Sequence, residues 1–349
     1  MIPYFVMLAI AYGLSLKVNE TRMFDDKQAQ MQKWILIAVM TVFIAFRYGV
    51  GADFFAYIKD YEIFSELTWG ECIVHKDPMT SVLAKVTSIF CSNYKLFFVG
   101  MALIFIGCSI CTVYRYSTDY TLSIVLFIIC GSFLDCCNAA RQCIAVGIVF
   151  ADYVNIKNQK LINHILFIVL ATLFHASAIT MMPLYFIFSP RASKMQTMMW
   201  LAGTAALMLF SFGSLFEATG EILGKDLDPD VAYFTHTVNT FRVLVYVAPC
   251  VLLFFTKEMK KRIPSYAVFI LFNAILTLVT CRSAYLMRIC IYTNVFLCLA
   301  LPEALQDLKL PKETIRSVKY IMVTCYMLFW VFNTYTSAGL YPYRFSLFD

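Results

Sequence analysis

The stretch Arg47-Tyr48-Gly49-Val50-Gly51-Ala52-Asp53 directly follows an apolar run from Trp34 to Phe46. A charge near the middle of a bilayer costs about 2.5–3.5 kcal/mol on insertion scales, so a charged residue at the end of a membrane helix usually faces a site rather than lipid. The two glycines let the backbone turn and approach a ligand closely. The arginine offers a rigid fork of donors that suits phosphate. We interpret this stretch as the lip of a membrane-embedded site for an anionic, lipid-linked substrate.

The composition places the whole chain in a membrane. Of 349 residues, 61% are hydrophobic and only 14% are charged, whereas soluble proteins average about 25% charged residues. We therefore predict an all-α protein with one integral membrane domain over residues 1–349. The net charge of +6 is better explained by membrane topology than by nucleic-acid binding. The 13 cysteines are scattered through apolar runs beside only 4 histidines, which favours small buried side chains over metal ligands.

Apolar runs of spanning or near-spanning length recur along the chain and predict about twelve transmembrane helices. The partly apolar stretch 78–94 is expected to form an interfacial or re-entrant helix. The apolar runs cover residues 2–16, 34–46, 96–114, 121–134, 139–154, 161–173, 176–189, 197–213, 242–256, 265–281, 284–301 and 319–334.

The distribution of basic residues predicts the orientation. More than half of the Lys and Arg residues fall in six segments that would share one side of the membrane: 17–33, 115–120, 155–160, 190–196, 257–264 and 302–319. Short loops rich in these residues stay in the cytoplasm, so both termini are predicted to lie outside. Two larger external segments, 47–94 and the acidic 214–241, would then cover the outer ends of the helices, the second as a lid.

The first candidate site residues flank the glycine turn. If a helix begins near Asp53, then Asp53, Tyr57 and Tyr61 share one face at i, i+4 and i+8. A carboxylate beside tyrosines suits the recognition of sugar hydroxyls. The alternative is structural, with Asp53 as a helix N-cap paired with Arg47.

Two further candidates lie at the predicted outer ends of later helices. Arg141-Gln142 opens an apolar run, where backbone N–H groups already favour anions, so a pyrophosphate would meet both. The alternative is an Arg141–Asp135 pair that closes a short hairpin. His175 lies in a tight turn between two apolar runs, and a neutral imidazole there can take a proton from an acceptor hydroxyl. The alternative for His175 is a structural role.

The C-terminal third adds more arginines and tyrosines. Arg282, Tyr285, Arg288 and Tyr292 are expected on one apolar helix, with Arg288 and Tyr292 on a shared face. Arginines without an acidic neighbour in sequence require an anion from elsewhere, which favours a phosphate ligand. Arg344, among the aromatic residues near the C-terminus, repeats this pattern; an interfacial aromatic belt is its alternative.

Motifs for other chemistries are absent from the sequence. It contains no P-loop, no GxSxG elbow, no HExxH and no DxD site for a metal–nucleotide sugar. The expected chemistry therefore uses an activated lipid-linked donor and needs no metal or other cofactor.

Taken together, these motifs resemble the EpsG family, which is similar to the Wzy-type polysaccharide polymerases of bacterial inner membranes. The resemblance runs in order along the chain: RYGVGADFFAYIKDYE from Arg47, Arg141-Gln142, His175-Ala176-Ser177-Ala178, Arg288 to Tyr292, and Pro342-Tyr343-Arg344-Phe345. It implies a multi-helix, GT-C-like membrane fold in the bacterial inner membrane. It also implies assembly of exopolysaccharide, capsule or O-antigen on undecaprenyl pyrophosphate, alongside chain-length regulator and flippase proteins of the same pathway.

The residues and the resemblance lead to one hypothesis, a metal-independent glycosyltransferase. A base, His175 or Asp53, would deprotonate the acceptor sugar while the donor's pyrophosphate leaves. The pyrophosphate and substrate contacts are assigned to Arg47, Arg141, Gln142, Arg282, Arg288, Arg344, Tyr57 and Tyr292. The alternatives are a flippase for lipid-linked oligosaccharides, a membrane O-acyltransferase and a glycan ligase.

Overall fold

The computed structural model describes residues 1–349 except 23, 189–192, 211–237, 261–262, 338 and 348–349. Most of the described residues are helical, and the only β structure among them is isolated bridges, so the all-α prediction is confirmed. In chain order the helices are α1 Ile2–Thr21, α2 Asp26–Ala45, α3 Phe54–Glu66, α4 Trp69–Val74, α5 Pro78–Phe90, α6 Lys95–Tyr116, α7 Tyr120–Ile129, α8 Ser132–Asn138, α9 Ala140–Ala151, α10 Tyr153–Lys157, α11 Leu161–Phe174, η1 Ala176–Met181, α12 Leu184–Ile187, α13 Lys194–Phe210, α16 Thr240–Val247, α17 Cys250–Leu253, η2 Glu258–Lys260, α18 Ser265–Thr280, η3 Leu286–Cys290, α19 Ile291–Asn294, α20 Leu297–Gln306 and α21 Lys312–Thr336.

The predicted twelve spans are not reproduced. Among the described residues, five helical spans are long and apolar enough to cross a membrane: α1, α2, α6, Tyr120–Asn138 (α7 with α8) and α21. A sixth forms if Leu286–Asn294 and Leu297–Gln306, which meet at 50°, count as one bent span.

Several apolar runs are divided into short helices, and proline explains two of the breaks. Pro183 separates η1 from α12, and Pro249 separates α16 from α17. Proline lacks the backbone N–H that continues a helix and clashes with the preceding turn. The run 284–301 is likewise split into η3, α19 and the start of α20. The apolar runs of the sequence therefore do form helices, but several of these helices are shorter than the runs.

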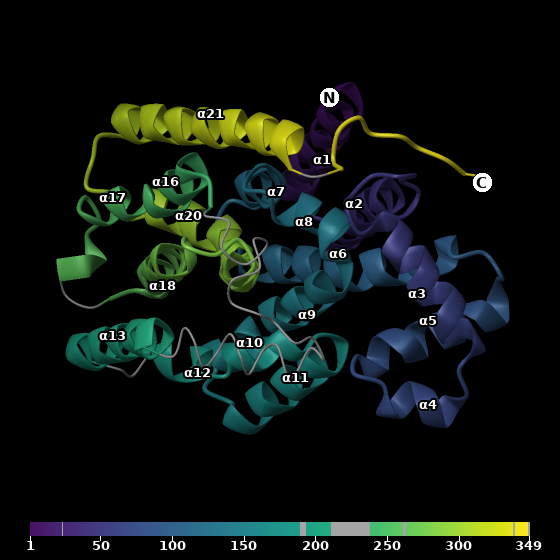
Figure 1. Ribbon diagram of the computed structural model, residues 1–349. Helices are drawn as coiled ribbons and strands as arrows, with labels where there is room; N and C mark the ends of the chain where they lie inside the picture. Colours follow the sequence, from purple (N-terminus) through teal and green to yellow (C-terminus); the bar gives the residue numbers. More distant parts are fainter. Residues whose placement is uncertain (23, 189–192, 211–237, 261–262, 338, 348–349) are drawn as a thin grey trace.

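The long helices α1 and α21 lie at one edge of the molecule, where α1 meets the C-terminal part of α21 at an angle (Figure 1). Only 33% of the spanning window of α1 and 17% of that of α21 is buried inside the protein. Large apolar side chains such as Phe5, Ile10, Ile321 and Leu328 remain exposed. Apolar surface on this scale fits contact with lipid tails rather than water.

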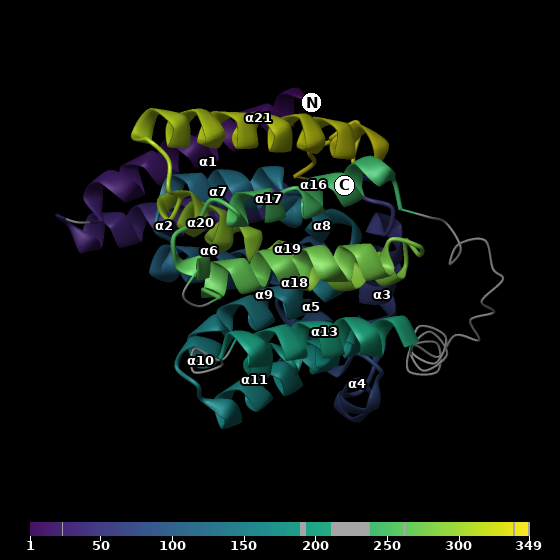
Figure 2. The ribbon, with the colours of Figure 1, turned by 90° about the vertical axis from the view of Figure 1, so that its left-hand side faces the viewer.

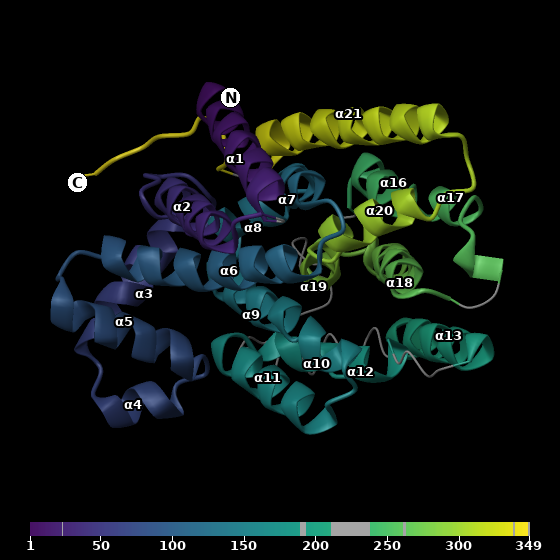
Figure 3. The ribbon, with the colours of Figure 1, turned by 180° about the vertical axis from the view of Figure 1, so that it is seen from behind.

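The centre of the molecule is the α6 helix, which crosses between α2 and α9 when seen from behind (Figure 3). α6 and α9 approach closely at Gly147, where a Cβ would lie 3.1 Å from the Phe105 backbone. Small residues allow such close backbone contact between membrane helices. Turned by 90°, the structure shows α18 running through the middle, with α13 on one side and α16 and α20 on the other (Figure 2).

The predicted external segment 47–94 folds as three helices, α3, α4 and α5. α4 begins with a capping box in which Thr68 and Glu71 satisfy each other's backbone N–H groups. The predicted helix within 78–94 is present as α5. The predicted lid at 214–241 lies outside the described residues except for its last few positions.

The C-terminal tail pairs with the glycine turn. The backbone N–H of Gly51 donates to Gly339 O (2.7 Å), and that of Tyr48 donates to Arg344 O (2.9 Å). An antiparallel bridge joins Arg47 to Phe345. The first and last sequence motifs therefore form one structural unit.

Candidate functional site

A group of charged side chains meets where α9 begins. Arg141 Nη1 lies 2.9 Å from Asp77 Oδ2 and 3.7 Å from Asp60 Oδ2. Asp60 comes from α3 and Asp77 precedes α5, so the α3–α5 segment delivers both carboxylates. The Arg141 side chain keeps 26% of its surface exposed. The alternative pairing of Arg141 with Asp135 is not formed, since Asp77 and Asp60 take its place.

Asp77 is the buried member of this group, at 5% exposure. Burial raises the pKa of Asp77 above its usual value, although the charges of Arg141 and Lys76 oppose this rise. A carboxylate that is desolvated and still paired with an arginine is typical of a functional site. Sequence reasoning missed Asp77; its position directly before Pro78, at the start of a helix, was the available signal.

His175 lies at the C-terminal end of α11, next to the Arg141 group. Its Nδ1 atom is buried and has no hydrogen-bond partner among the described residues. Burial lowers the pKa of His175 to about 4, and the charges of Arg141, Arg288 and Lys76 act in the same direction. The ring is therefore neutral at pH 7, and its buried Nδ1 makes no hydrogen bond to the described part of the protein.

Gln142 and Tyr292 are placed beside this group but contact protein. Gln142 Nε2 donates to the backbone carbonyl of Arg288 (2.8 Å), so Gln142 fixes the chain that carries Arg288. The hydroxyl of buried Tyr292 lies 3.1 Å from Ser177 Oγ, two residues after His175. Both residues thus hold together the segments that carry the charged groups.

The expectation that Arg282, Tyr285, Arg288 and Tyr292 share one helix is wrong. α18 ends at Thr280, Arg282 lies in the following turn, and Arg288 belongs to the 3-10 helix η3. The tight turn brings Arg288 back toward His175 and leaves its side chain exposed. Arg282 is also exposed, but it is not among the charges that act on His175.

Arg47 has a position different from the one expected for a phosphate ligand. It is 2% exposed, and its guanidinium donates to Val50 O (3.0 Å), Ile44 O (2.6 Å) and Cys137 O (3.4 Å). The side chain also packs over the Phe98 ring, 5.0 Å from its centroid. Arg47 thus holds the glycine turn against α8.

Asp53 and Tyr57 lie on the α3 side of the site. Asp53 is the N-cap of α3 by position, but its side chain makes no capping bond, and Arg47 bonds carbonyls, so the structural alternative is not formed. Tyr57 is buried below the Arg141 guanidinium, 5.8 Å from ring centroid to Cζ. Tyr61 shares its face, as expected, but its hydroxyl donates to Cys91 O.

Arg344 shares the glycine-turn unit through its backbone only. Its side chain is exposed, and no contact among the described residues joins it to Arg141 or His175. The structure therefore brings together Arg141, Arg288, Gln142, His175, Tyr57 and Tyr292, and leaves Arg282 and Arg344 at the surface.

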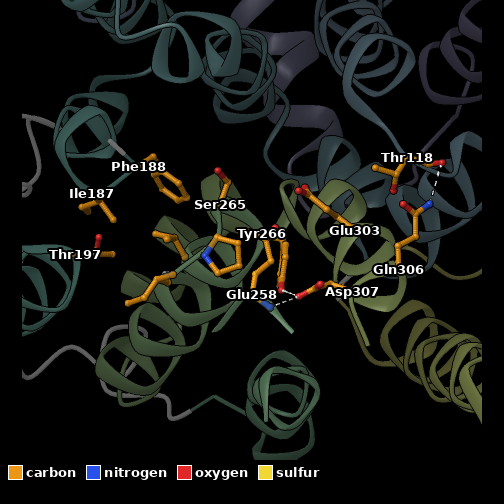
Figure 4. Close-up of a pocket in the computed structure, with 13 residues that line it drawn as sticks. Thr118, Ile187, Phe188, Thr197, Glu258, Ser265, Tyr266, Glu303, Gln306 and Asp307 are labelled. Atoms are coloured by element: carbon orange, nitrogen blue, oxygen red, sulfur yellow. Dashed lines mark hydrogen bonds between the residues drawn. The ribbon is translucent and has the colours of Figure 1, made fainter. Parts of the chain in front are cut away.

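A cavity of about 370 Å³ lies elsewhere, at the Ser265 end of α18 (Figure 4). Its lining includes Glu258, Glu303 and Asp307, and Asp307 accepts a 2.6 Å hydrogen bond from the Tyr266 hydroxyl. The Arg141 group lies toward the other end of α18, because η3, which carries Arg288, follows Thr280. The α18 helix is itself about 24 Å long at 1.5 Å per residue. Carboxylates repel a pyrophosphate, so this cavity does not extend the arginine-rich site.

No cluster of His, Cys, Asp and Glu suited to a metal is present among the described residues. The fold and the charged group together define an all-helical membrane protein with a candidate site at one end of its helices. Residues 32–345 match the EpsG family, which is related to the Wzy-like polymerases. The chain belongs to this family. No curated protein and no solved structure matches it.

Proposed function

We propose that this chain is a polysaccharide polymerase that joins lipid-linked repeat units at the outer face of the bacterial inner membrane. One observation carries the proposal: a neutral imidazole with a buried, unpartnered nitrogen lies within reach of two guanidinium charges. A base beside cations is what transfer of a glycan from a diphosphate requires. The donor would be a growing glycan on undecaprenyl pyrophosphate and the acceptor one repeat unit on a second carrier.

The chemistry is a single displacement. The acceptor hydroxyl oxygen forms a bond to the donor's anomeric carbon as the bond from that carbon to the pyrophosphate oxygen breaks. The hydroxyl proton passes to His175, and the electron pair stays on the departing lipid pyrophosphate. Preorganised cations directed at such developing charge contribute roughly 3–4 kcal/mol per well-placed donor. The product is expected with inverted anomeric configuration; NMR of the linkage showing retention would contradict this displacement.

The guanidinium charges also couple the base to the donor. In the empty site they lower the pKa of His175. A diphosphate bound at Arg288 offsets that positive charge, and a nearby opposite charge favours the protonated imidazole. His175 therefore becomes a stronger base when the donor is in place. His175 is preferred over Asp53 because Arg141 and Arg288 act on His175 directly.

The test is complementation of a deletion strain, read as glycan length on gels. We expect His175→Ala, Arg141→Ala and Arg288→Ala to leave single repeat units on the carrier or the acceptor surface. Arg316→Ala is the matched control, an exposed arginine on α21, and should restore the full ladder. A defect that leaves no repeat unit outside indicates a flippase. Full ladders from all three site variants would rule out this site.

The pH dependence gives a separate prediction. In purified protein, kcat/KM reports groups of the free enzyme, so its acid limb is expected near pH 4, where His175 protonates. The acid limb of kcat, which reports the donor complex, should lie at higher pH. A kcat/KM limb near the unperturbed value of about 6.5 would contradict this environment for His175.

Protonation of His175 also affects the free energy of unfolding. Melting temperatures measured over the same pH range separate this effect from the effect on catalysis. The unfolded chain binds a proton at His175 near pH 6.5, and the folded chain does so only near pH 4. Between these values the unfolded state holds more protons, so stability falls as pH drops through this window. The His175→Ala variant should lack this component of the fall.

A further inference from the structure

Arg242, which sequence reasoning left unmarked, is held beside α8. Its Nη2 donates to Asn333 Oδ1 on α21 and to Ser337 Oγ (3.4 Å). Asn333 in turn lies against Gly131, where an added Cβ would be 3.8 Å from Asn333 Nδ2. Gly131 is the N-cap of α8, and its carbonyl accepts from the backbone N–H of Asp135 (3.1 Å).

Arg288 approaches α8 from the other direction. Its backbone carbonyl is bound by Gln142 of α9 (2.8 Å), and α9 begins two residues after α8 ends. The α19 helix that follows Arg288 packs on both α8 and α9. Arg242 and Arg288 are the two cations whose charges act on the Asp135 carboxylate.

The two halves of the site carry different charge balances. Within the described residues no ion pair joins Arg242 or Arg288 to a carboxylate. The charges of these two guanidiniums act on one half-buried carboxylate, Asp135. Arg141, in contrast, is already paired with two carboxylates, Asp77 and Asp60. The positive charge of Lys76 offsets the second negative charge of this group.

We infer that Arg242 and Arg288 form the subsite for the donor's diphosphate, whereas Arg141 with Asp60 and Asp77 belongs to the acceptor side. This inference rests on the proposed function. A diphosphate binds most strongly to guanidiniums that are not already neutralised, and charge-assisted hydrogen bonds are the strong ones. Paired carboxylates with an exposed edge suit the hydroxyls of a neutral sugar. Asp135 sets the net charge of the diphosphate subsite.

Binding of undecaprenyl pyrophosphate without sugar tests the division, with full-length protein in nanodiscs and dissociation constants measured by thermophoresis. Arg242→Gln and Arg288→Gln keep a hydrogen-bonding side chain and remove the charge. Each is expected to weaken binding about tenfold or more, because each loses charge-assisted hydrogen bonds to the diphosphate. Arg141→Gln should stay within a factor of about two of wild type, since its charge is already compensated. Asp135→Asn should bind more tightly.

Two controls make the outcomes distinct. Melting temperatures establish that the variants are folded. Arg242→Lys keeps the charge and should retain most of the affinity; this comparison holds even where the glutamine variant is unstable. One outcome would overturn the division but leave the proposed function intact: Arg141→Gln weakens binding as much as Arg288→Gln does, whereas Arg242→Gln binds like wild type. If wild-type protein binds undecaprenol as tightly as undecaprenyl pyrophosphate, both the division of the site and the proposed function are contradicted.

Discussion

Replacing Gly51 with alanine is expected to leave little or no folded protein in the membrane. Gly51 has a φ of +100°, a conformation that costs L-residues about 1–3 kcal/mol. In addition, the new Cβ would lie 2.1 Å from the backbone oxygen of Cys137 and 2.8 Å from its carbonyl carbon. The clashing atoms belong to backbone rather than to a flexible side chain, so relief requires a shift of the glycine turn away from Cys137. Such a shift disturbs the Gly51–Gly339 hydrogen bond. The total loss is expected to exceed about 4–5 kcal/mol, the upper end for point mutations.

Gly13→Ala is the matched control for this substitution. Gly13 lies in α1 with no atom within 4 Å of its added Cβ and no positive φ, and alanine is the better helix former. Membrane levels and melting temperatures in detergent should be unchanged or slightly higher for Gly13→Ala. A Gly51→Ala protein that melts at the wild-type temperature would show that the turn differs from this structure.

Replacing Arg47 with alanine is expected to destabilise the protein by about 3–5 kcal/mol, because a buried acceptor left without its donor costs about 1–3 kcal/mol. Three carbonyls, of Ile44, Val50 and Cys137, receive its donors. The variant also loses the packing of the guanidinium over Phe98. We therefore expect a lower melting temperature and less protein in the membrane, whether or not substrate is present.

Arg344→Ala distinguishes this effect from loss of a nearby charge. Arg344 joins the same structural unit through its backbone, and its side chain is exposed, so its removal should leave the melting temperature unchanged. An Arg47→Ala protein with normal stability but no polymerisation would return Arg47 to the role of substrate ligand.

Local patterns predicted the class of protein and several elements of the fold. The apolar runs identify a membrane protein, and the glycine turn after Phe46 is present, with Gly49 and Gly51 both at positive φ. The helix beginning near Asp53 is also present, as α3. These features depend on neighbours in sequence, which is why they could be read directly.

Features that depend on distant partners could not be read in this way. Whether Arg47 faces a ligand or a carbonyl is decided by Cys137, ninety positions away. Arg141 is paired by Asp77 rather than by Asp135, which is closer in sequence, because α5 packs on α6 and α11 and thereby places Asp77 beside the start of α9. Arg242 stood at the edge of an apolar run, and its partner Asn333 lies on the last helix.

The dependence of the glycine turn on the C-terminal tail has a consequence for biosynthesis. Gly51 leaves the ribosome roughly three hundred residues before Gly339, a delay of about 15–60 s at ordinary elongation rates. Until then the turn lacks its partner, the C-terminal tail. The same turn also contacts the start of the site, because the Ala52 N–H donates to Asn138 Oδ1 (2.7 Å), just before Arg141. A nascent or prematurely terminated chain therefore occupies the bilayer without a completed glycine turn, which can form only after translation has passed Gly339.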